Sequence, residues 1–230
     1  MSAKRAQASP WAPFEDRRRA RDEKKHAVLR MAAQLFLDVG YHRATLNEVA
    51  TRLNITKPAL YNYFRSKEEI LDECYRLGQQ MAEDAIAEID EAGGDGLTRL
   101  RKLIRAYALL MTIDFGMCLV RLDDRELSED AHRRVRAEKR QDDRAFRRYI
   151  EAGVADGSIV DCDPKLAAFA IAGSLNWIGH WYREGGTYSA EEIANQFADL
   201  LTTGLQARRT RGRNHKAAPR AGVALRSKRR

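Results

Sequence analysis

The chain has 230 residues, enough to bury one large hydrophobic core or two smaller ones. Its three cysteines lie far apart, which argues against a disulfide framework or a zinc site, and no apolar run approaches the roughly 20 residues that span a bilayer. We therefore expect a cytoplasmic protein without a metal or another cofactor. The net charge of +8 points to an anionic partner.

Charge is distributed unevenly along the chain. Residues 1–70 carry 14 Lys and Arg against 8 Asp and Glu, residues 71–205 carry 17 against 25, and residues 206–230 carry 10 against none. The three segments therefore have net charges of +6, −8 and +10. A basic first segment before an acidic body is typical of a DNA-binding module joined to a domain with another task, with chance unevenness as the alternative.

The first element in chain order is a flexible basic arm, assigned to residues 1–21, where Pro10 and Pro13 interrupt a stretch without an apolar period. Its cations suit neighbouring phosphates or a minor groove, and a solvated tail is the alternative. From about residue 16 to residue 39, apolar side chains recur at helical spacing until Gly40. This pattern predicts a helix with one apolar face.

The next stretch is predicted to form two short helices joined by a tight polar turn. Thr45 and Glu48 have the spacing of a capping box, which begins the first helix. Asn54 tolerates a positive φ and can end that helix. Thr56 can cap the second helix, with Pro58 in its first turn, where a missing amide costs little. The pattern indicates a helix-turn-helix.

Residues 45–69, with Met31-Ala-Ala-Gln-Leu-Phe and Gly40-Tyr upstream, resemble the tetracycline-repressor (TetR) family of transcriptional regulators. Pro58 stands where that family often has glycine. The resemblance implies DNA contacts by eight residues: Arg43, Thr45, Thr56, Lys57, Ala59, Tyr61, Asn62 and Lys67. Among these, Asn62 or Thr56 suits base edges and Ala59 suits a thymine methyl group, whereas Lys and Tyr suit phosphates.

Helical patterns continue through the rest of the chain. Ser66 can cap a helix that ends before Gly93, and further helices are predicted at residues 97–113, 115–122, 128–154, 166–182 and 189–205. Gly153 and Gly157 are expected to end the long charged helix. We therefore expect an all-α fold of about nine helices. Its parts would be a three-helix DNA-binding domain at residues 22–66, a helical ligand-binding and dimerisation domain at residues 67–205, and a disordered basic tail at residues 206–230.

Aromatic and long apolar side chains in the body exceed what simple outer helices need. An ordinary core is one explanation, and the family resemblance implies instead a small-molecule pocket. The predicted lining residues are Tyr107, Met111, Phe115, Met117, Arg121, Asn176, Trp177, His180 and Trp181. Arg121 suits an anionic ligand, with an ion pair to Asp123, Asp124 or Glu126 as the alternative.

The segment at residues 176–194 looks like regulators of this family that respond to acyl-CoA thioesters. The predicted effector is therefore an acyl-CoA ester from lipid, aromatic or steroid catabolism. The last two helices also carry apolar residues on more than one face, which favours burial against a second copy. The predicted homodimer interface comprises Leu166, Phe169, Ala170, Ile193, Phe197, Leu200 and Leu201, and a two-fold dimer implies a palindromic operator.

Two other classes of function remain as alternatives. An enzyme is disfavoured because no catalytic motif appears, and the carboxylates at residues 123–130 precede or begin a helix, where negative charge is favoured anyway. An architectural DNA-binding protein without a ligand would use the basic arm and tail, and would bind operator and random duplex nearly equally. The preferred prediction is a repressor that a small molecule releases from its operator, with activation left open.

Overall fold

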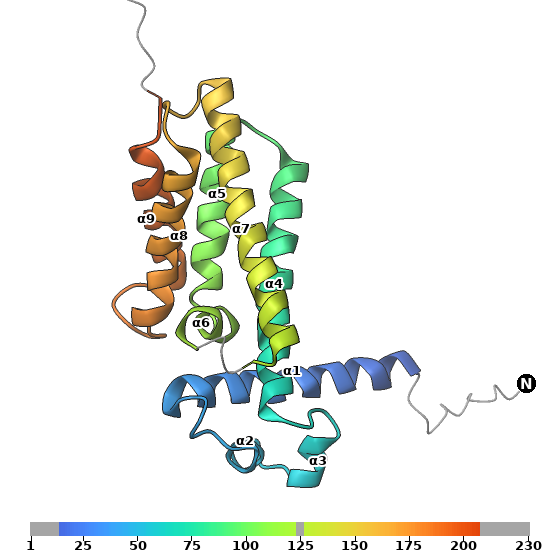
Figure 1. Cartoon of the computed structure of the whole chain (residues 1–230). Helices are drawn as coiled ribbons and strands as arrows, with labels where there is room; N and C mark the ends of the chain where they lie inside the picture. The colour runs from blue at the N-terminus through green and yellow to red at the C-terminus, as the bar shows by residue number, and fades with distance from the viewer. Residues whose placement is uncertain (1–13, 123–126, 208–230) are drawn as a thin grey trace, which may run out of the picture.

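The computed structural model describes residues 14–122 and 127–207. Within these ranges the chain forms nine α-helices and one isolated bridge, so the predicted all-α fold is confirmed. The helices, in chain order, are α1 (Phe14–Val39), α2 (Leu46–Arg52), α3 (Lys57–Tyr61), α4 (Lys67–Ala92), α5 (Gly96–Leu110), α6 (Asp114–Arg121), α7 (Glu129–Asp156), α8 (Pro164–Trp181) and α9 (Ala190–Thr203). Figure 1 shows a head of α1 to α3 beneath an upright bundle of α4 to α9, with α1 lying across the base.

The local signals in the head act as the sequence indicates. The Thr45 hydroxyl accepts a hydrogen bond from the Glu48 amide at 3.2 Å, and the Thr45 amide donates to the Glu48 carboxylate at 3.3 Å. Asn54 has φ 53°, which ends the first helix of the motif. The Thr56 hydroxyl accepts from the Ala59 amide at 3.4 Å and caps α3. The predicted capping box and turn are therefore confirmed.

Two hydrophobic cores share one helix. The first half of α4 buries Ile70 and Leu71 in the core of the head, whereas its second half buries Ile89 in the core of the body. The head core also takes in Leu127 and Val135, which belong to the start of α7 and the residues before it. Packing of the head therefore extends past residue 66, where the sequence division places the domain boundary.

The structure changes two details of the sequence division. Residues 14–21 belong to α1, although the sequence pattern places the basic arm at residues 1–21. Helix α7 also continues through Gly153 and ends at Gly157, which has φ 77°. Gly153 lies inside the helix, where the start of α5 approaches its backbone and a Cβ would meet the Ile159 side chain. The rest of the predicted arm, and the tail from residue 208 onward, lie outside the described residues.

The chain turns sharply between α5 and α6, whose axes are bent by 91°. Gly116 permits this turn, because a Cβ there would lie 1.7 Å from the Leu110 carbonyl oxygen. In the described ranges no single helix is long and apolar enough to cross a membrane, and only this bent pair passes such a test when taken together. The turn places α6 at the base of the bundle beside α1 (Figure 1).

The contact between α5 and α7 allows a stability prediction. A Cβ added to Gly96 would lie 2.1 Å from the Gly153 amide nitrogen, so Gly96→Ala must push the two helices apart. We expect a loss of about 1–3 kcal/mol in the free energy of unfolding, the usual cost of overpacking. Urea denaturation followed by circular dichroism measures it.

The matched control is Gly204→Ala, at a glycine with ordinary φ −73° and no atom within 4 Å of an added Cβ. Its free energy of unfolding should change by less than about 1 kcal/mol. Equal effects of the two substitutions would contradict the close helix contact.

Candidate functional site

The exposed face of α3 forms one end of the molecule. Leu60 and Phe64 are buried in the head core, so the opposite side of α3 is left exposed. That side carries Lys57, Tyr61 and Asn62, all solvent-exposed, and the Lys57 ammonium lies 5.8 Å from the centre of the Tyr61 ring. Figure 1 places α2 and α3 at the end of the head away from the bundle. A rigid helix therefore presents cationic, aromatic and amide groups in a position open to a DNA groove.

The loop between α1 and α2 is held by two basic side chains predicted to contact phosphate. The Arg43 Nε donates to the Val39 carbonyl at 2.6 Å, which satisfies the end of α1. The Lys67 ammonium donates to the Tyr41 and His42 carbonyls at 2.8 and 3.2 Å. An ammonium has three N–H groups, so Lys67 keeps one donor beyond these contacts. Its phosphate contact stays a prediction beside this role in fixing the loop.

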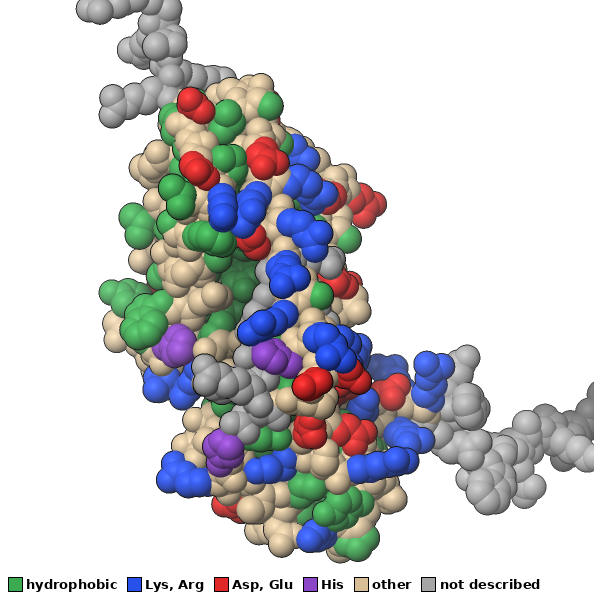
Figure 2. All heavy atoms as spheres, in the orientation of Figure 1, with side chains coloured by type: hydrophobic (Ala, Val, Ile, Leu, Met, Phe, Trp, Pro, Cys, Tyr) green, Lys and Arg blue, Asp and Glu red, His purple; other side chains and the backbone are tan. Residues whose placement is uncertain are grey.

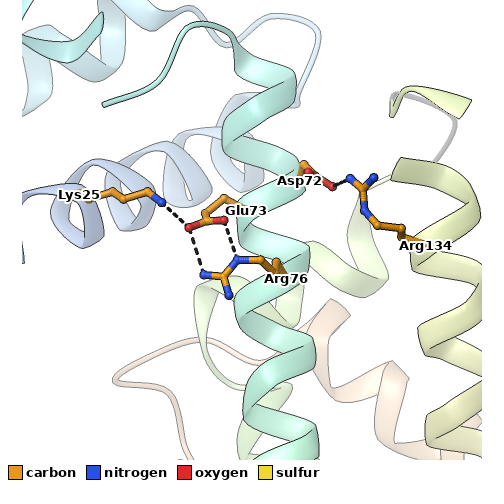
Figure 3. A network of polar contacts seen from close by, with 5 residues as sticks. All are labelled: Lys25, Asp72, Glu73, Arg76 and Arg134. Atoms are coloured by element: carbon orange, nitrogen blue, oxygen red, sulfur yellow. Dashed lines mark hydrogen bonds and ion pairs between the residues drawn. The ribbon is translucent and has the colours of Figure 1, made fainter. Parts of the chain in front are cut away.

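A polar network joins the head to the body (Figure 3). Glu73 of α4 accepts from Lys25 of α1 at 2.5 Å and from Arg76 at 2.7 Å. The neighbouring Asp72 forms an ion pair with Arg134 of α7 at 2.6 Å. The Arg76 hydrogen bond, together with the hydrogen bond and charge of Lys25, outweighs burial and lowers the pKa of Glu73 to about 2. These contacts hold α1 and α7 to the same turns of α4.

Sequence reasoning missed this network. The spacing of Glu73 and Arg76 on one helix face was a usable signal. Lys25 lies 48 positions from Glu73, and no local pattern pairs them.

A cleft of about 910 Å³ lies where the head meets the body. Its walls come from α1, α4, α6 and the loop between α8 and α9. Three of the predicted ligand-binding residues line it: Phe115, Met117 and Arg121. Sequence reasoning did not select the lining residues Arg30 and Met81, because nothing local shows that α1 and α4 face α6.

The remaining six predicted ligand-binding residues lie elsewhere. Tyr107 lines a separate cavity of about 20 Å³ and donates a hydrogen bond to Asn176 at 3.3 Å. Met111 is fully buried in the body core. Trp177 is 63% exposed and stacks on His180 with 5.1 Å between ring centres, and Trp181 is also exposed. The structure therefore does not gather the nine residues into one pocket.

The predicted dimer residues divide between an exposed face and the protomer's own core. Leu166, Phe169, Ala170 and Leu200 are exposed, with Leu200 at 72%. Ile193 is buried in the core of its own body, and Phe197 and Leu201 pack partly against that core. Figure 2 shows hydrophobic side chains along the left edge of the body, where Figure 1 has α8 and α9. The apolar pattern on several faces thus serves two surfaces, one of which is uncovered in the single chain.

Comparison with known protein families identifies both parts of the chain. Residues 28–74 match the model of bacterial regulatory proteins of the tetR family, and residues 93–205 match that of the tetracyclin repressor-like C-terminal domain. The chain belongs to the TetR family. The first match covers the helix-turn-helix and the start of α4, and the second covers α5 to α9. The head is therefore the DNA-binding domain of a regulatory protein.

Individual TetR relatives extend over most of the chain. The transcriptional repressor KstR2 of Rhodococcus jostii is 26% identical over 197 residues, covering 84% of this chain and 96% of the relative. The structure of the TetR regulator PfmR from Thermus thermophilus is 30% identical, with TM-score 0.69 over 78% of this chain and 98% of that one. A structure of AibR with isovaleryl coenzyme A and operator DNA shares the fold, at 24% identity and TM-score 0.67 over 78% and 98% of the two chains.

The Glu73 network predicts an acid-dependent loss of stability. The pKa of Glu73 is about 2 in the folded protein against 4.5 for the free side chain. Its stabilising contribution should therefore be complete above about pH 4.5 and be lost as the pH falls toward 2. Lys25 and Arg76 are both more than a third exposed, so screening by water holds this contribution to about 1 kcal/mol.

Glu73→Gln should remove this contribution and flatten the acid side of the stability profile. Urea denaturation between pH 3 and pH 7 measures the difference from the unmodified protein. Glu91→Gln, at an exposed position of the same helix, serves as the control and should leave the profile unchanged. An unchanged profile for Glu73→Gln would contradict the assignment.

Proposed function

We propose that the protein is a homodimeric transcriptional repressor that binds a palindromic operator and releases it when an acyl-CoA thioester binds. The observation that carries the proposal is the exposed face of α3, held by buried Leu60 and Phe64 and displayed at the end of the head. The relative KstR2 is named a transcriptional repressor, which supports repression over activation. A two-fold pair of such heads would place two recognition helices in successive major grooves.

The residues of the head divide between base and phosphate contacts. Asn62 ends α3 with an exposed amide that suits an adenine edge, and Lys57 and Tyr61 beside it suit phosphates. Arg43 keeps its terminal nitrogens beyond the contact with Val39, so a phosphate near the start of α2 suits it. Thr45 begins α2, where free backbone amides also favour an anion.

The uncovered apolar face of α8 and α9 supports the dimer. Leu166, Phe169, Trp177 and Leu200 are all more than half exposed in the single chain. Exposed apolar patches of this kind mark interaction surfaces in soluble proteins. A second copy of the same helices would form a four-helix interface and fix the distance between the two heads.

The nature of the effector is supported by relatives. AibR has been crystallised with isovaleryl coenzyme A and operator DNA, and KstR2 of Mycobacterium tuberculosis is described as a ketosteroid transcriptional regulator. Coenzyme A esters combine several phosphate charges with an acyl group that prefers an apolar surrounding. The cleft at the base of the body combines both kinds of lining, with Arg121 beside Phe115 and Met117.

Release requires that the effector favour a body conformation that displaces the head. Contacts of α1 with α4 and α6 transmit such a change: Lys25 binds Glu73, Gln34 binds Asp114, and Arg121 binds the Leu37 carbonyl. A ligand shifts this balance only by its difference in affinity between the two states. The two heads would then no longer match the half-site spacing, and operator affinity would fall.

Substitutions in α3 test the DNA-binding role. Asn62→Ala should lower the preference for operator over random duplex by about 1–3 kcal/mol, the value of a good base contact. Lys57→Ala should instead weaken binding to both duplexes alike. It should also reduce the salt dependence of binding by the contribution of about one phosphate contact. Fluorescence anisotropy with a duplex from the gene's own upstream region measures both.

Lys102→Ala, at an exposed position of α5 in the body, is the control for this series and should leave DNA affinity unchanged. Equal affinity of the unmodified protein for operator and random duplex would reject the repressor and favour an architectural role.

The dimer has its own test in Leu200→Glu. Leu200 is largely exposed in the single chain, so a charge there should leave the protomer folded but oppose burial in an interface. Light scattering at micromolar concentration should show a dimer for the unmodified protein and a monomer for this variant. The control variant Ala87→Glu, at an exposed position of α4, should remain dimeric. A monomeric unmodified protein would refute the interface and the palindromic operator.

A further inference from the structure

We propose that the cleft between head and body binds the anionic head group of the effector, and that Met81 is a gate through which the apolar tail enters a cavity in the bundle. The inference rests on the proposed function, because it assigns the effector a position. It adds that the ligand contacts α1 of the DNA-binding head directly. It also makes Met81 the residue that sets the length of the tail.

The first observation is that Met81 lines both spaces. It forms part of the wall of the 910 Å³ cleft and part of the wall of the 20 Å³ cavity among α4, α5 and α7. The side chain is 46% exposed, so it is not held by core packing on all sides. Met81 therefore lies between a large cleft with charged and apolar walls and a small cavity with apolar walls.

The second observation concerns the walls of the smaller cavity. Its lining has no charged residue and includes three alanines, Ala82, Ala85 and Ala106, beside Ile86 and Phe146. Phe146 packs edge-to-face on Tyr107 with 5.6 Å between ring centres, which fixes that wall. Methionine is unbranched and has three rotatable side-chain bonds, so it changes position at low cost. Movement of Met81 would thus join the two spaces.

The third observation is a set of guanidinium groups from three elements. Arg30 of α1, Arg121 of α6 and Arg183 of the loop after α8 line the cleft. None of the three forms an ion pair with a carboxylate in the part of the chain that the structure describes. Guanidinium groups bind phosphate and carboxylate oxygens through paired hydrogen bonds.

Three carboxylates line the same cleft, and one of them is paired with a cation outside it. Asp38 forms an ion pair with Arg52 at 3.1 Å, and Asp114 accepts a hydrogen bond from Gln34 at 3.1 Å. Glu184 is the remaining acidic residue of the lining. The three guanidinium groups therefore outnumber the two carboxylates, Asp114 and Glu184, that oppose an incoming anion.

The position of the site links binding to the head. The Arg121 guanidinium donates to the Leu37 carbonyl near the end of α1 at 3.4 Å. An anion bound by Arg121 and Arg30 would compete for that donor and lie between α1 and α6, the two helices that these contacts hold together. Occupation of the cleft would therefore act on α1 without a relay through the rest of the bundle.

The experiment measures affinity and operator release for coenzyme A and for straight-chain esters from butyryl to palmitoyl coenzyme A. The dye anilinonaphthalene sulfonate, an anionic amphipath, provides a probe that does not depend on the natural effector. Met81→Ala should bind the longer esters about tenfold more tightly, which is the gain from burying roughly two more methylene groups. It should also increase the fluorescence of the bound dye. Coenzyme A alone should bind this variant as it binds the unmodified protein.

Three further variants complete the series. Met81→Trp should weaken binding of the longer esters and leave binding of coenzyme A unchanged, because the larger side chain blocks the passage. Arg121→Gln should lower the affinity for coenzyme A, for every ester and for the dye by a similar factor, whatever the chain length. Gln80→Ala changes the exposed neighbour of Met81 on α4, which lines neither space, and should match the unmodified protein. Circular dichroism checks the fold of each variant.

The outcomes separate this inference from the proposed function. If esters release the operator and both Met81 variants keep the original chain-length preference, the gate is wrong and the repressor stands. If no ester binds but dye binding changes as expected in the Met81 and Arg121 variants, the gated anion site stands and the acyl-CoA effector is wrong. If neither esters nor dye respond to these substitutions, the inference is overturned.

Discussion

The structure depends on the requirement that one uninterrupted helix be buried in two cores. Helix α4 has 26 residues and so extends about 39 Å, from the base of the helix-turn-helix to the far end of the bundle. Its first turns fill the head core with Ile70 and Leu71, and its last turns fill the body core with Ile89. Because a continuous helix is stiff, a displacement of its body end also moves its head end.

Polar contacts between α1 and the helices α4 and α6 also couple the head to the body. Glu73 holds α1 through Lys25, while Asp114 and Arg121 of α6 hold α1 at Gln34 and Leu37. Hydrogen bonds at the border of the open cleft thus join head and body, and away from the cleft an apolar core that includes Cys118 and Val135 of the body joins them as well. The polar contacts at the cleft exchange readily with water or a ligand, so this side of the joint is the part suited to change its arrangement.

The body shows how one apolar pattern can serve two purposes. Helices α8 and α9 bury Ile171, Leu175 and Ile193 against their own bundle and leave Phe169 and Leu200 exposed. A single chain has no further element to cover the exposed set, which is why a second copy is the economical partner. The tryptophans predicted to line a pocket, Trp177 and Trp181, are also exposed on α8.

Local chemistry by itself determined the helices, their caps, the helix-turn-helix and the exposed residues of its second helix. Thr45, Asn54 and Thr56 act on amides only a few residues away, so spacing alone predicts their roles. The cleft, the pairing of Lys25 with Glu73 and the two-sided position of Met81 arise where helices distant in sequence meet. Only the tertiary structure decided these features, because the 91° turn between α5 and α6 and the packing of α1 beneath them set which side chains face one another.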